Sequence, residues 1–355
     1  MTKIIMKFNA FKKTAIFLFV LLLWAGAPLF AYERDWSANP AWIEIAGARR
    51  VCAVGDIHGA FDQMAATLKA LGVAERTSPD SFAYNWIGKD TVLIFLGDYA
   101  NRGLYTKQVY DAIHDLQQKA PKYGGQVIAL LGNHEIRLLN GEIQEKAAKK
   151  KSKKNQDYQN TIDSFTRDGL DYNEAVSEKG FYGKMVRNMP LFAVINGYFF
   201  SHGGLNNDPV SKATLSSAFM DAIDKGDFNK GILVNEEMLI WNRDWWDDFE
   251  LIERNLKLLG VSGVVFGHTP GAFGKDKGKI ASKYDKIVAI DIGMTPLHGY
   301  SNGGGLEILM LSDKSLQFKA IYPDLPEEHI FSVPAPSEPP SHSEREFWMY
   351  DYNNR

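Results

Sequence analysis

Three short motifs with acidic, imidazole and amide side chains occur in order along the first half of the chain. They are Gly55-Asp56-Ile57-His58-Gly59, Gly97-Asp98-Tyr99-Ala100-Asn101-Arg102-Gly103 and Gly132-Asn133-His134-Glu135. Two histidine motifs follow later, Ser201-His202-Gly203-Gly204 and Gly267-His268-Thr269. Any one of these motifs alone is a weak signal, because such loops are often simple turns. Together and in this order they favour a metal site.

The residue types and their spacing suit metal ligation. Asp56 and His58 are two residues apart, so at the end of a strand both side chains can face one ion. Asp98 has two carboxylate oxygens and can bridge two ions, and Asn133 offers a neutral amide oxygen. A mixed set of nitrogen and oxygen ligands suits Mn, Fe or Zn better than Ca. With the two later histidines, the set predicts a centre with two divalent or trivalent metal ions.

Such a centre predicts the hydrolysis of phosphoesters. Two ions about 3.5–4 Å apart can turn a shared water into a hydroxide near neutral pH, and this bridging hydroxide can attack phosphorus in line. Arg102 can contact a phosphate bidentately, and Arg243 is the second candidate for that role. His134 lies next to the expected ligand Asn133 and could protonate the leaving oxygen.

Short buried strands must position these residues. Six apolar runs predict them: Val51–Val54, Val92–Leu96, Val127–Leu131, Phe192–Phe200, Val261–Phe266 and Ile287–Ile290. The spacing of apolar residues predicts two helices between the first three runs: Phe61–Leu71 and Thr106–Lys119. The repeated order of strand, motif loop and helix indicates an α/β fold, and such folds place ligand sites just beyond the strand ends. Each motif falls at such a position.

The N-terminal residues predict export. Lysines, the apolar run Thr14–Trp24 and small residues up to Ala31 are typical of a signal peptide spanning residues 1–31, with a periplasmic or secreted product. Cleavage after Ala27 is a second possibility. The alternative is an uncleaved membrane anchor, since the apolar stretch is nearly long enough to span a bilayer. The formal net charge of −3, with both signs mixed along the chain, gives no indication of nucleic-acid binding.

The rest of the chain predicts one phosphoesterase domain over residues 32–330. A polar segment at about 142–180, with a lysine run at 149–154, predicts either helices that cap the site or a mobile insert. The lysine run is either a solvated surface or a basic rim that attracts phosphorylated substrates. Residues 331–355 are rich in proline and predict an extended or disordered tail. Cys52, the single cysteine, is expected to be a buried small hydrophobe.

The motifs resemble the signature of the phosphoprotein-phosphatase family of calcineurin-like metallophosphoesterases. That signature is Gly-Asp-x-His-Gly, Gly-Asp-x-x-Asp-Arg-Gly and Gly-Asn-His-Glu, followed by His-Gly-Gly and one more metal-binding histidine. The match spans Cys52 to His268. Four stretches resemble the bacterial Shewanella-like branch in particular: Gly132–Gly141, Gly267–Pro270, Ile290–Met294 and Gly305–Ile308.

The resemblance implies a fold and a role for each candidate residue. The fold is a four-layer αββα sandwich. One ion would be held by Asp56, His58 and Asp98, and the other by Asp98, Asn133, His202 and His268. By the same resemblance, His134 would be the general acid and Arg102 would hold phosphate, with Arg243 a less close match.

Asn101 departs from the family pattern. The family has an aspartate there, which hydrogen-bonds the catalytic histidine and raises its proton affinity. A neutral amide can orient an imidazole but stabilises its charged form less well. Diadenosine-tetraphosphatase-like relatives also lack that aspartate. The expected substrates are phosphomonoesters, including Ser, Thr or Tyr phosphoproteins. The alternatives are a nucleotide or dinucleoside-polyphosphate hydrolase and, favoured only by Asn101, a non-catalytic phosphate-binding module.

Overall fold

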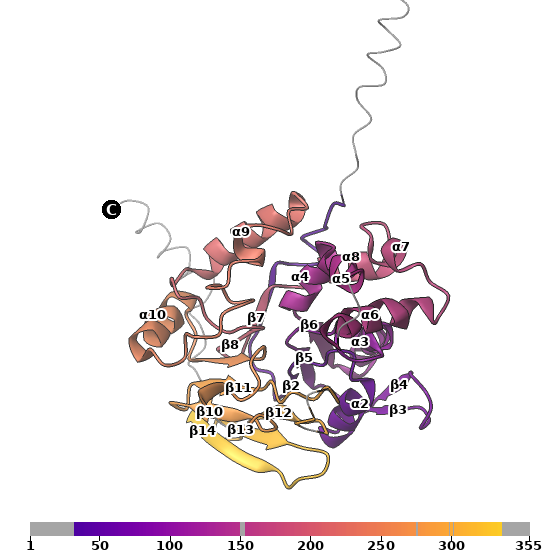
Figure 1. Ribbon diagram of the computed structural model, residues 1–355. Helices are drawn as coiled ribbons and strands as arrows, with labels where there is room; N and C mark the ends of the chain where they lie inside the picture. The colour runs from indigo at the N-terminus through magenta and orange to yellow at the C-terminus, as the bar shows by residue number, and fades with distance from the viewer. Residues whose placement is uncertain (1–31, 150–152, 275, 298, 301, 336–355) are drawn as a thin grey trace, which may run out of the picture. The chain divides into compact units, whose positions relative to one another are not determined.

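The computed structural model describes residues 32–149, 153–274, 276–297, 299–300 and 302–335 (Figure 1). The predicted signal peptide, the tail from residue 336 on and most of the lysine run lie outside the described residues. The elements named below all belong to the compact unit that begins at Arg34. Among the helices in these described ranges, none has the length and apolar character needed to cross a membrane.

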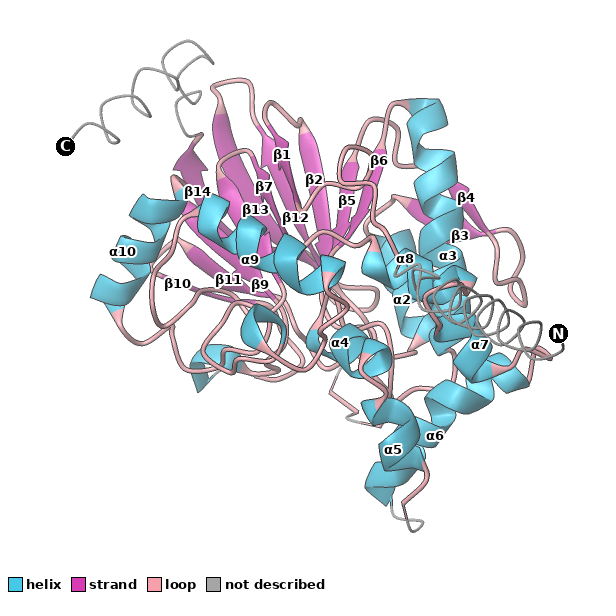
Figure 2. Ribbon diagram, turned by 90° about the horizontal axis from the view of Figure 1, so that it is seen from above, coloured by secondary structure: helices cyan, strands magenta, loops and turns pink. Residues whose placement is uncertain are grey.

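Two six-stranded mixed sheets form the centre of this unit (Figure 2). The first sheet, in spatial order, contains β1 (Trp42–Ile45), β7 (Phe192–Ile195), β8 (Tyr198–Ser201), β9 (Gly263–Phe266), β11 (Ile287–Ala289) and β10 (Ala281–Lys283). The second contains β14 (Glu328–Pro334), β13 (Ser315–Ile321), β12 (Gly305–Met310), β2 (Arg50–Val54), β5 (Val92–Phe95) and β6 (Gln126–Ala129). A small separate hairpin pairs β3 (Ala74–Arg76) with β4 (Tyr84–Trp86).

Helices lie on both sides of the strands. Figure 2 shows α2 and α3 on one side and α9 and α10 on the other. The α-helices are α2 (Phe61–Ala70), α3 (Thr106–Lys119), α4 (Asn133–Leu139), α5 (Glu142–Ala147), α6 (Lys153–Thr166), α7 (Tyr172–Val176), α8 (Phe181–Arg187), α9 (Lys212–Asp224) and α10 (Phe249–Leu259). Three single turns of 3-10 helix are η1 (Ala120–Tyr123), η2 (Gly231–Leu233) and η3 (Ala272–Gly274).

The arrangement confirms the predicted α/β class. Strands β2, β5 and β6 run parallel, and their successive connections contain α2 and α3. Their apolar runs are buried, as expected of strands covered on both faces. The two sheets share one core, in which the ring of Tyr198 on β8 lies 4.8 Å from that of Phe318 on β13. Cys52 on β2 is fully buried in this core, and burial raises the pKa of its thiol to about 12.

The predicted strand Phe192–Phe200 is wrong as a single element. It forms two antiparallel strands, β7 and β8, which pair Ala193 with Phe200. The turn between them is Asn196-Gly197, whose φ angles are 50° and 76°. Asn and Gly tolerate positive φ and form the tight hairpin turn that matches the twist of the flanking strands. The dipeptide was a turn signal inside an otherwise continuous apolar run.

The predicted tail boundary at residue 330 is also too early. Strand β14 continues to Pro334, at the edge of the second sheet. Phe331 is buried, and its ring stacks on that of Phe318 with 4.4 Å between the centroids. This aromatic cross-strand pair stabilises the edge strand despite the prolines that follow it. In the polar segment 142–180 the structure places α5, α6 and α7, with Phe165 of α6 fully buried.

Candidate metal centre

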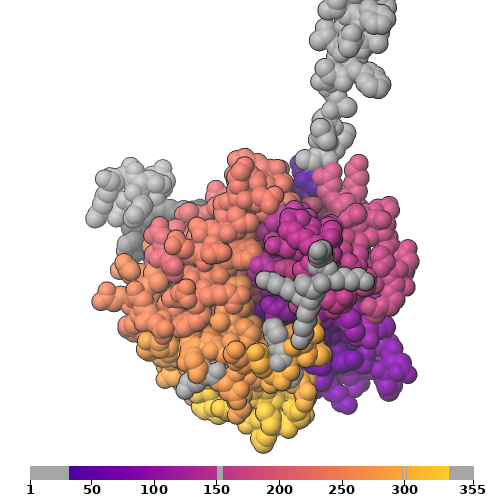
Figure 3. All heavy atoms as spheres, in the orientation of Figure 1, coloured from indigo at the N-terminus to yellow at the C-terminus, as the bar shows by residue number. Residues whose placement is uncertain are grey.

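The loops that follow six strands converge on one place. Three of these strands, β2, β5 and β6, belong to the second sheet, and three, β8, β9 and β11, belong to the first. Figure 3 shows that N-terminal segments in indigo and magenta meet later segments in orange and yellow on this surface of the molecule. The polar residues directly after these strands are almost completely buried: Asp56, His58, Asp98, Asn133, His202, His268 and Asp291.

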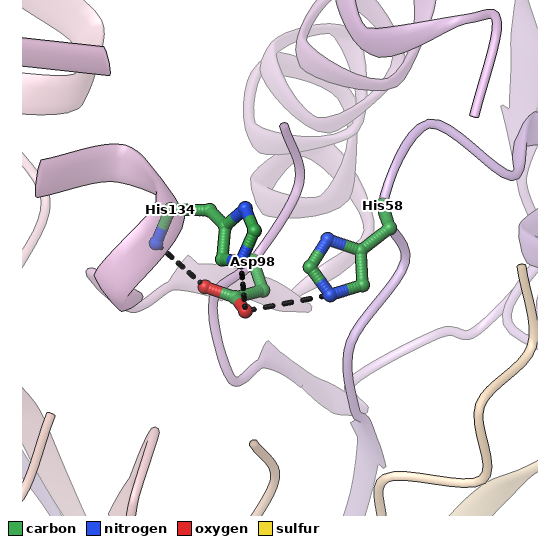
Figure 4. A group of neighbouring side chains, drawn as sticks. All are labelled: His58, Asp98 and His134. Atoms are coloured by element: carbon green, nitrogen blue, oxygen red, sulfur yellow. Dashed lines mark hydrogen bonds and ion pairs between the residues drawn. The ribbon is translucent and has the colours of Figure 1, made fainter. Parts of the chain in front are cut away.

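One cluster at this place consists of His58, Asp98 and His134 (Figure 4). The Nε2 atom of His58 lies 3.4 Å from Asp98 Oδ2, and the Nε2 atom of His134 lies 3.8 Å from the same oxygen. Asp56 is adjacent, with its Oδ2 3.8 Å from His58 Nε2. The four side chains present nitrogen and oxygen atoms to one small volume.

A second cluster consists of Asp98, His202 and His268, with Asn133 beside them. His202 Nε2 lies 3.2 Å from Asp98 Oδ1 and 3.0 Å from His268 Nδ1. The amide of Asn133 lies 3.0 Å from His202 Nε2. Asp98 therefore directs Oδ2 toward the first cluster and Oδ1 toward the second, which is the geometry that a bridging carboxylate requires.

Backbone carbonyls orient the histidines of both clusters. His58 Nδ1 donates to Ala100 O at 2.8 Å, and His202 Nδ1 donates to Leu96 O at 2.9 Å. His268 Nε2 donates to Trp241 O at 3.0 Å. Each hydrogen bond keeps a ring proton on the nitrogen that faces away from the cluster, so the other nitrogen faces inward and can present its lone pair to a metal ion. Metal-binding histidines are commonly oriented in this way.

The inner surface of the site is rich in acceptors, and this fits metal ions. His58 Nε2 is buried and has no hydrogen-bond partner. The oxygen of the Asn133 amide faces only acceptors, namely both Asp98 oxygens, His202 Nε2 and His268 Nδ1. Buried polar atoms normally have partners, and cations would supply them here. The residues present therefore fit a pair of metal ions, with Asp98 shared between them.

The electrostatics of the site favour added positive charge. Burial lowers the pKa of His58 to about 3. Burial also disfavours the charged form of His202, but Asp98 and Asp56 outweigh it and raise the pKa of His202 to about 9. Burial, reinforced by Asp291, raises the pKa of Asp56 well above its usual range. Closely spaced buried carboxylates that cannot all stay charged become charged readily when a cation binds.

Strained backbone is concentrated at this site. His58, Asp98 and His268 have φ angles of 48°, 57° and 67°, and Asn101 and Arg102 have 70° and 69°. Residues other than glycine rarely adopt positive φ, because the Cβ atom is crowded there. Such strain persists only where the surrounding structure enforces it, and it is concentrated at functional sites.

Two buried acids at the site were not predicted as functional residues. Glu135 accepts hydrogen bonds from the backbone N–H groups of Asp98, at 2.7 Å, and Tyr99, at 3.0 Å, and so anchors the loop that carries Asp98. The position of Glu135 at the end of the third motif was the sequence feature that could have identified it as functional. Asp291 follows β11 and accepts from Gly293 N at 2.9 Å. Burial raises the pKa of Asp291 to about 6.

The structure also places the remaining candidates. Asn101 Nδ2 lies 2.7 Å from His134 Nδ1, so the residue that departs from the family pattern contacts the predicted general acid directly. Arg243 donates to His268 O at 2.6 Å and to Thr269 Oγ1 at 3.1 Å, which places its guanidinium beside the second cluster. Arg102 is half-buried on the loop after β5. Phosphate binding by either arginine stays a prediction.

The fold and the two clusters define a metallophosphoesterase domain. Residues 49–272 match the model of the calcineurin-like phosphoesterase family, which is more than half of the chain. The chain therefore belongs to the calcineurin-like phosphoesterase family. The predicted family is confirmed, and the family match also supports the predicted metal-dependent phosphatase chemistry.

Similar proteins agree with the Shewanella-like branch that the sequence predicted. Shewanella-like protein phosphatase 1 of Plasmodium berghei (strain Anka) is 29% identical over 159 residues, which cover 44% of this chain and 39% of the relative. Shewanella-like protein phosphatase 2 of Arabidopsis thaliana is 27% identical over 94 residues, covering 26% of this chain and 22% of the relative. The chain thus spans well under half the length of these curated relatives.

A solved structure confirms the fold. The cold-active protein-tyrosine phosphatase of a psychrophilic Shewanella species has a TM-score of 0.64 to this chain at 20% identity. The match covers 82% of this chain and 82% of that one, so it extends over both six-stranded sheets and not only over the motif loops.

Proposed function

We propose that the protein is a metal-dependent phosphatase that hydrolyses phosphomonoesters, including phosphoproteins. The observation that carries the proposal is that Asp98 faces two separate clusters of histidines, one with each carboxylate oxygen. Asp56, His58 and Asp98 would hold one ion, and Asp98, Asn133, His202 and His268 the other. When bound, a pair of ions of this kind activates water and neutralises phosphoryl charge. The protein-phosphatase relatives support the substrate class.

The residues around the clusters supply the remaining functions. Arg102 and Arg243 are the cations that would orient the phosphoryl group and balance its charge. His134 is held beside Asp98 by a hydrogen bond from its own backbone N–H to Asp98 Oδ1, at 2.9 Å. Its imidazole then lies where it can donate a proton or a hydrogen bond to the leaving oxygen. The contact of Asn101 with His134 favours good leaving groups, so nucleotides and dinucleoside polyphosphates are the second candidate substrates.

A substrate panel tests the proposed function. Purified protein loaded separately with Mn, Fe and Zn would be assayed on p-nitrophenyl phosphate, on peptides phosphorylated at Ser, Thr or Tyr, and on a dinucleoside polyphosphate. Turnover of phosphopeptides above that of the dinucleoside polyphosphate is expected. The reverse order would favour the nucleotide alternative. Absence of turnover in every combination, with no metal found by elemental analysis, would favour a phosphate-binding module.

Replacement of Asn101 by aspartate tests the departure from the family pattern. Burial lowers the pKa of His134 well below its usual range. A carboxylate at 2.7 Å in place of the amide would raise that pKa, because it attracts the charged imidazole. The protonated pool of His134 would then persist to higher pH. Asn101→Asp is expected to speed alkyl phosphomonoesters by about three- to tenfold, with less effect on aryl ones, and to move the high-pH limb of the rate profile upward.

The control for Asn101→Asp is to compare its rates on alkyl and aryl substrates within one protein preparation. Equal effects on alkyl and aryl substrates, together with an unchanged pH profile, would mean that Asn101 only maintains the turn of its loop.

We also propose that the mature protein is located in the periplasm or secreted. The lysines, apolar run and small residues of 1–31 support this, and these residues lie outside the described structure. N-terminal sequencing of the native protein is expected to begin near Tyr32. Recovery of the intact chain from the cytosol would contradict export, and recovery of the intact chain from membranes would indicate the anchored alternative.

A further inference from the structure

Helix α6, which belongs to the polar segment at 142–180, is hydrogen-bonded to the loop that carries Asn101 and Arg102. The backbone N–H of Arg102 donates to Asp157 O at 3.1 Å, and Asn160 Nδ2 donates to Arg102 O at 2.8 Å. The backbone N–H of Asn101 donates to Thr161 Oγ1 at 2.9 Å. The helix therefore contacts the two consecutive residues of the loop that have positive φ.

Thr161 makes a second hydrogen bond to the same residue. Its hydroxyl donates to Asn101 Oδ1 at 3.0 Å, and Thr161 itself is fully buried. A hydroxyl has one hydrogen, and here that hydrogen is directed at the amide oxygen while the hydroxyl oxygen accepts from the Asn101 backbone. The side-chain amide of Asn101 is thereby held with its oxygen toward Thr161 and its nitrogen toward His134.

This orientation determines which nitrogen of His134 carries the proton. Asn101 Nδ2 donates to His134 Nδ1 at 2.7 Å, so Nδ1 acts as the acceptor. In the neutral imidazole the proton is then on Nε2, the atom that lies 3.8 Å from Asp98 Oδ2. A rotated Asn101 amide would present its oxygen to Nδ1 instead and would move the proton away from the metal clusters.

We propose that Thr161 is a positioning residue that fixes the tautomer of His134 through the amide of Asn101. Thr161 contacts neither cluster and acts through two hydrogen bonds in series. Its effect on turnover rests on the proposed phosphatase function, whereas its effect on the tautomer does not. In this arrangement helix α6 of the polar segment orients the side chain that would donate a proton to the leaving group.

Two substitutions at residue 161 separate the hydroxyl from the shape of the side chain. Thr161→Val keeps the shape and removes the hydroxyl, and Thr161→Ser keeps the hydroxyl. Ser164→Ala is the control for loss of a buried hydroxyl on α6, because Ser164 accepts from Lys107 N at 3.2 Å and donates to the backbone O of Thr161 at 2.7 Å, but does not bond to the Thr161 hydroxyl or to Asn101. Thermal unfolding of each variant would show how far the fold is preserved.

The tautomer would be read from two-bond 1H–15N correlations of His134 in the zinc-loaded, 15N-histidine-labelled protein. We expect the wild type and Thr161→Ser to show the proton on Nε2, and Thr161→Val to gain a population protonated at Nδ1. Thr161→Val is also expected to lose about tenfold in kcat on alkyl phosphomonoesters, with KM within about twofold, as a partial loss of the proton-donor effect. Thr161→Ser and Ser164→Ala should stay within about twofold in kcat.

Three results would overturn the inference. One is a wild-type spectrum with His134 protonated at Nδ1 or at both nitrogens. Another is an unchanged tautomer in Thr161→Val. The third is a similar loss of kcat in Thr161→Val, Thr161→Ser and Ser164→Ala, accompanied by a similar fall in their melting temperatures. If no variant and no wild-type preparation hydrolyses any phosphoester, the proposed function fails, and the tautomer spectra still decide the role of Thr161.

Discussion

Asp98→Asn is expected to reduce turnover by at least about a thousandfold and to release at least one metal ion per chain. The carboxylate is fully buried and presents one oxygen to each histidine cluster. An amide has a single oxygen and no charge, so it cannot serve both clusters in the same way. Elemental analysis of the purified variant, beside steady-state kinetics, would measure both effects.

Metal content should also distinguish the two clusters. His58→Ala is expected to weaken the binding of mainly one ion, and His202→Ala the binding of mainly the other. The reason is that these side chains contact opposite oxygens of Asp98. Asp115→Asn is a suitable control, since Asp115 pairs with Lys119 on α3 at 2.7 Å, away from the site. If Asp98→Asn retained both ions and normal turnover, the carboxylate could not be the bridge.

His134→Gln is expected to lower kcat by about 10²–10⁴-fold on substrates with poor leaving groups. Glutamine can replace the hydrogen bonding of the imidazole in part but cannot transfer a proton. The loss should be smaller on aryl phosphates, whose leaving oxygen needs less protonation. Metal content should stay near the wild-type value, because the proposed ligand sets do not include His134.

The His134→Gln variant also tests whether His134 is a metal ligand of the first cluster. His134 Nε2 lies 3.8 Å from Asp98 Oδ2, so the imidazole is close enough to the cluster to act as a ligand itself. Loss of one ion per chain in His134→Gln would therefore assign His134 to the metal and not to the leaving group. His114→Gln is the matched control, since His114 packs edge-on against Phe181 with ring centroids 5.0 Å apart.

The positions of the candidate ligand residues were predictable because parallel strands end at the same edge of a sheet. Asp98 and Asn133 follow β5 and β6 as the apolar runs indicated, and the same logic applied to His202 and His268 on the other sheet. The hairpin between β7 and β8 was missed because the apolar run appears continuous across Asn196-Gly197. Strand β13 was overlooked although buried Leu316, Phe318 and Ala320 alternate with more exposed residues, a two-residue period.

Other features of the site could not be read from the sequence. The positive φ angles of Asp98 and Asn101 depend on the tertiary contacts of the loop, and no local sequence pattern predicts them. Thr161 is 60 residues from Asn101 in the chain and lies in a segment whose polar composition resembles a solvated surface. Asp291 lies in a stretch that resembles the Shewanella-like branch, but its burial and its closeness to Asp56 are seen only in the structure.

The loops of the candidate metal centre come from both sheets, and this has a consequence for how the chain would bind metal ions. Asp56 accepts from the backbone of His268, 212 residues later, and Leu96 accepts from His202, 106 residues later. Contacts between such distant segments form late in folding, because closing long loops has an entropic cost. During synthesis, the residues of the first three motifs leave the ribosome well before His268 does. If the two clusters bind metal ions as proposed, full occupancy would require the completed chain, and a molecule truncated before β9 would contain most of the candidate ligands but lack His268.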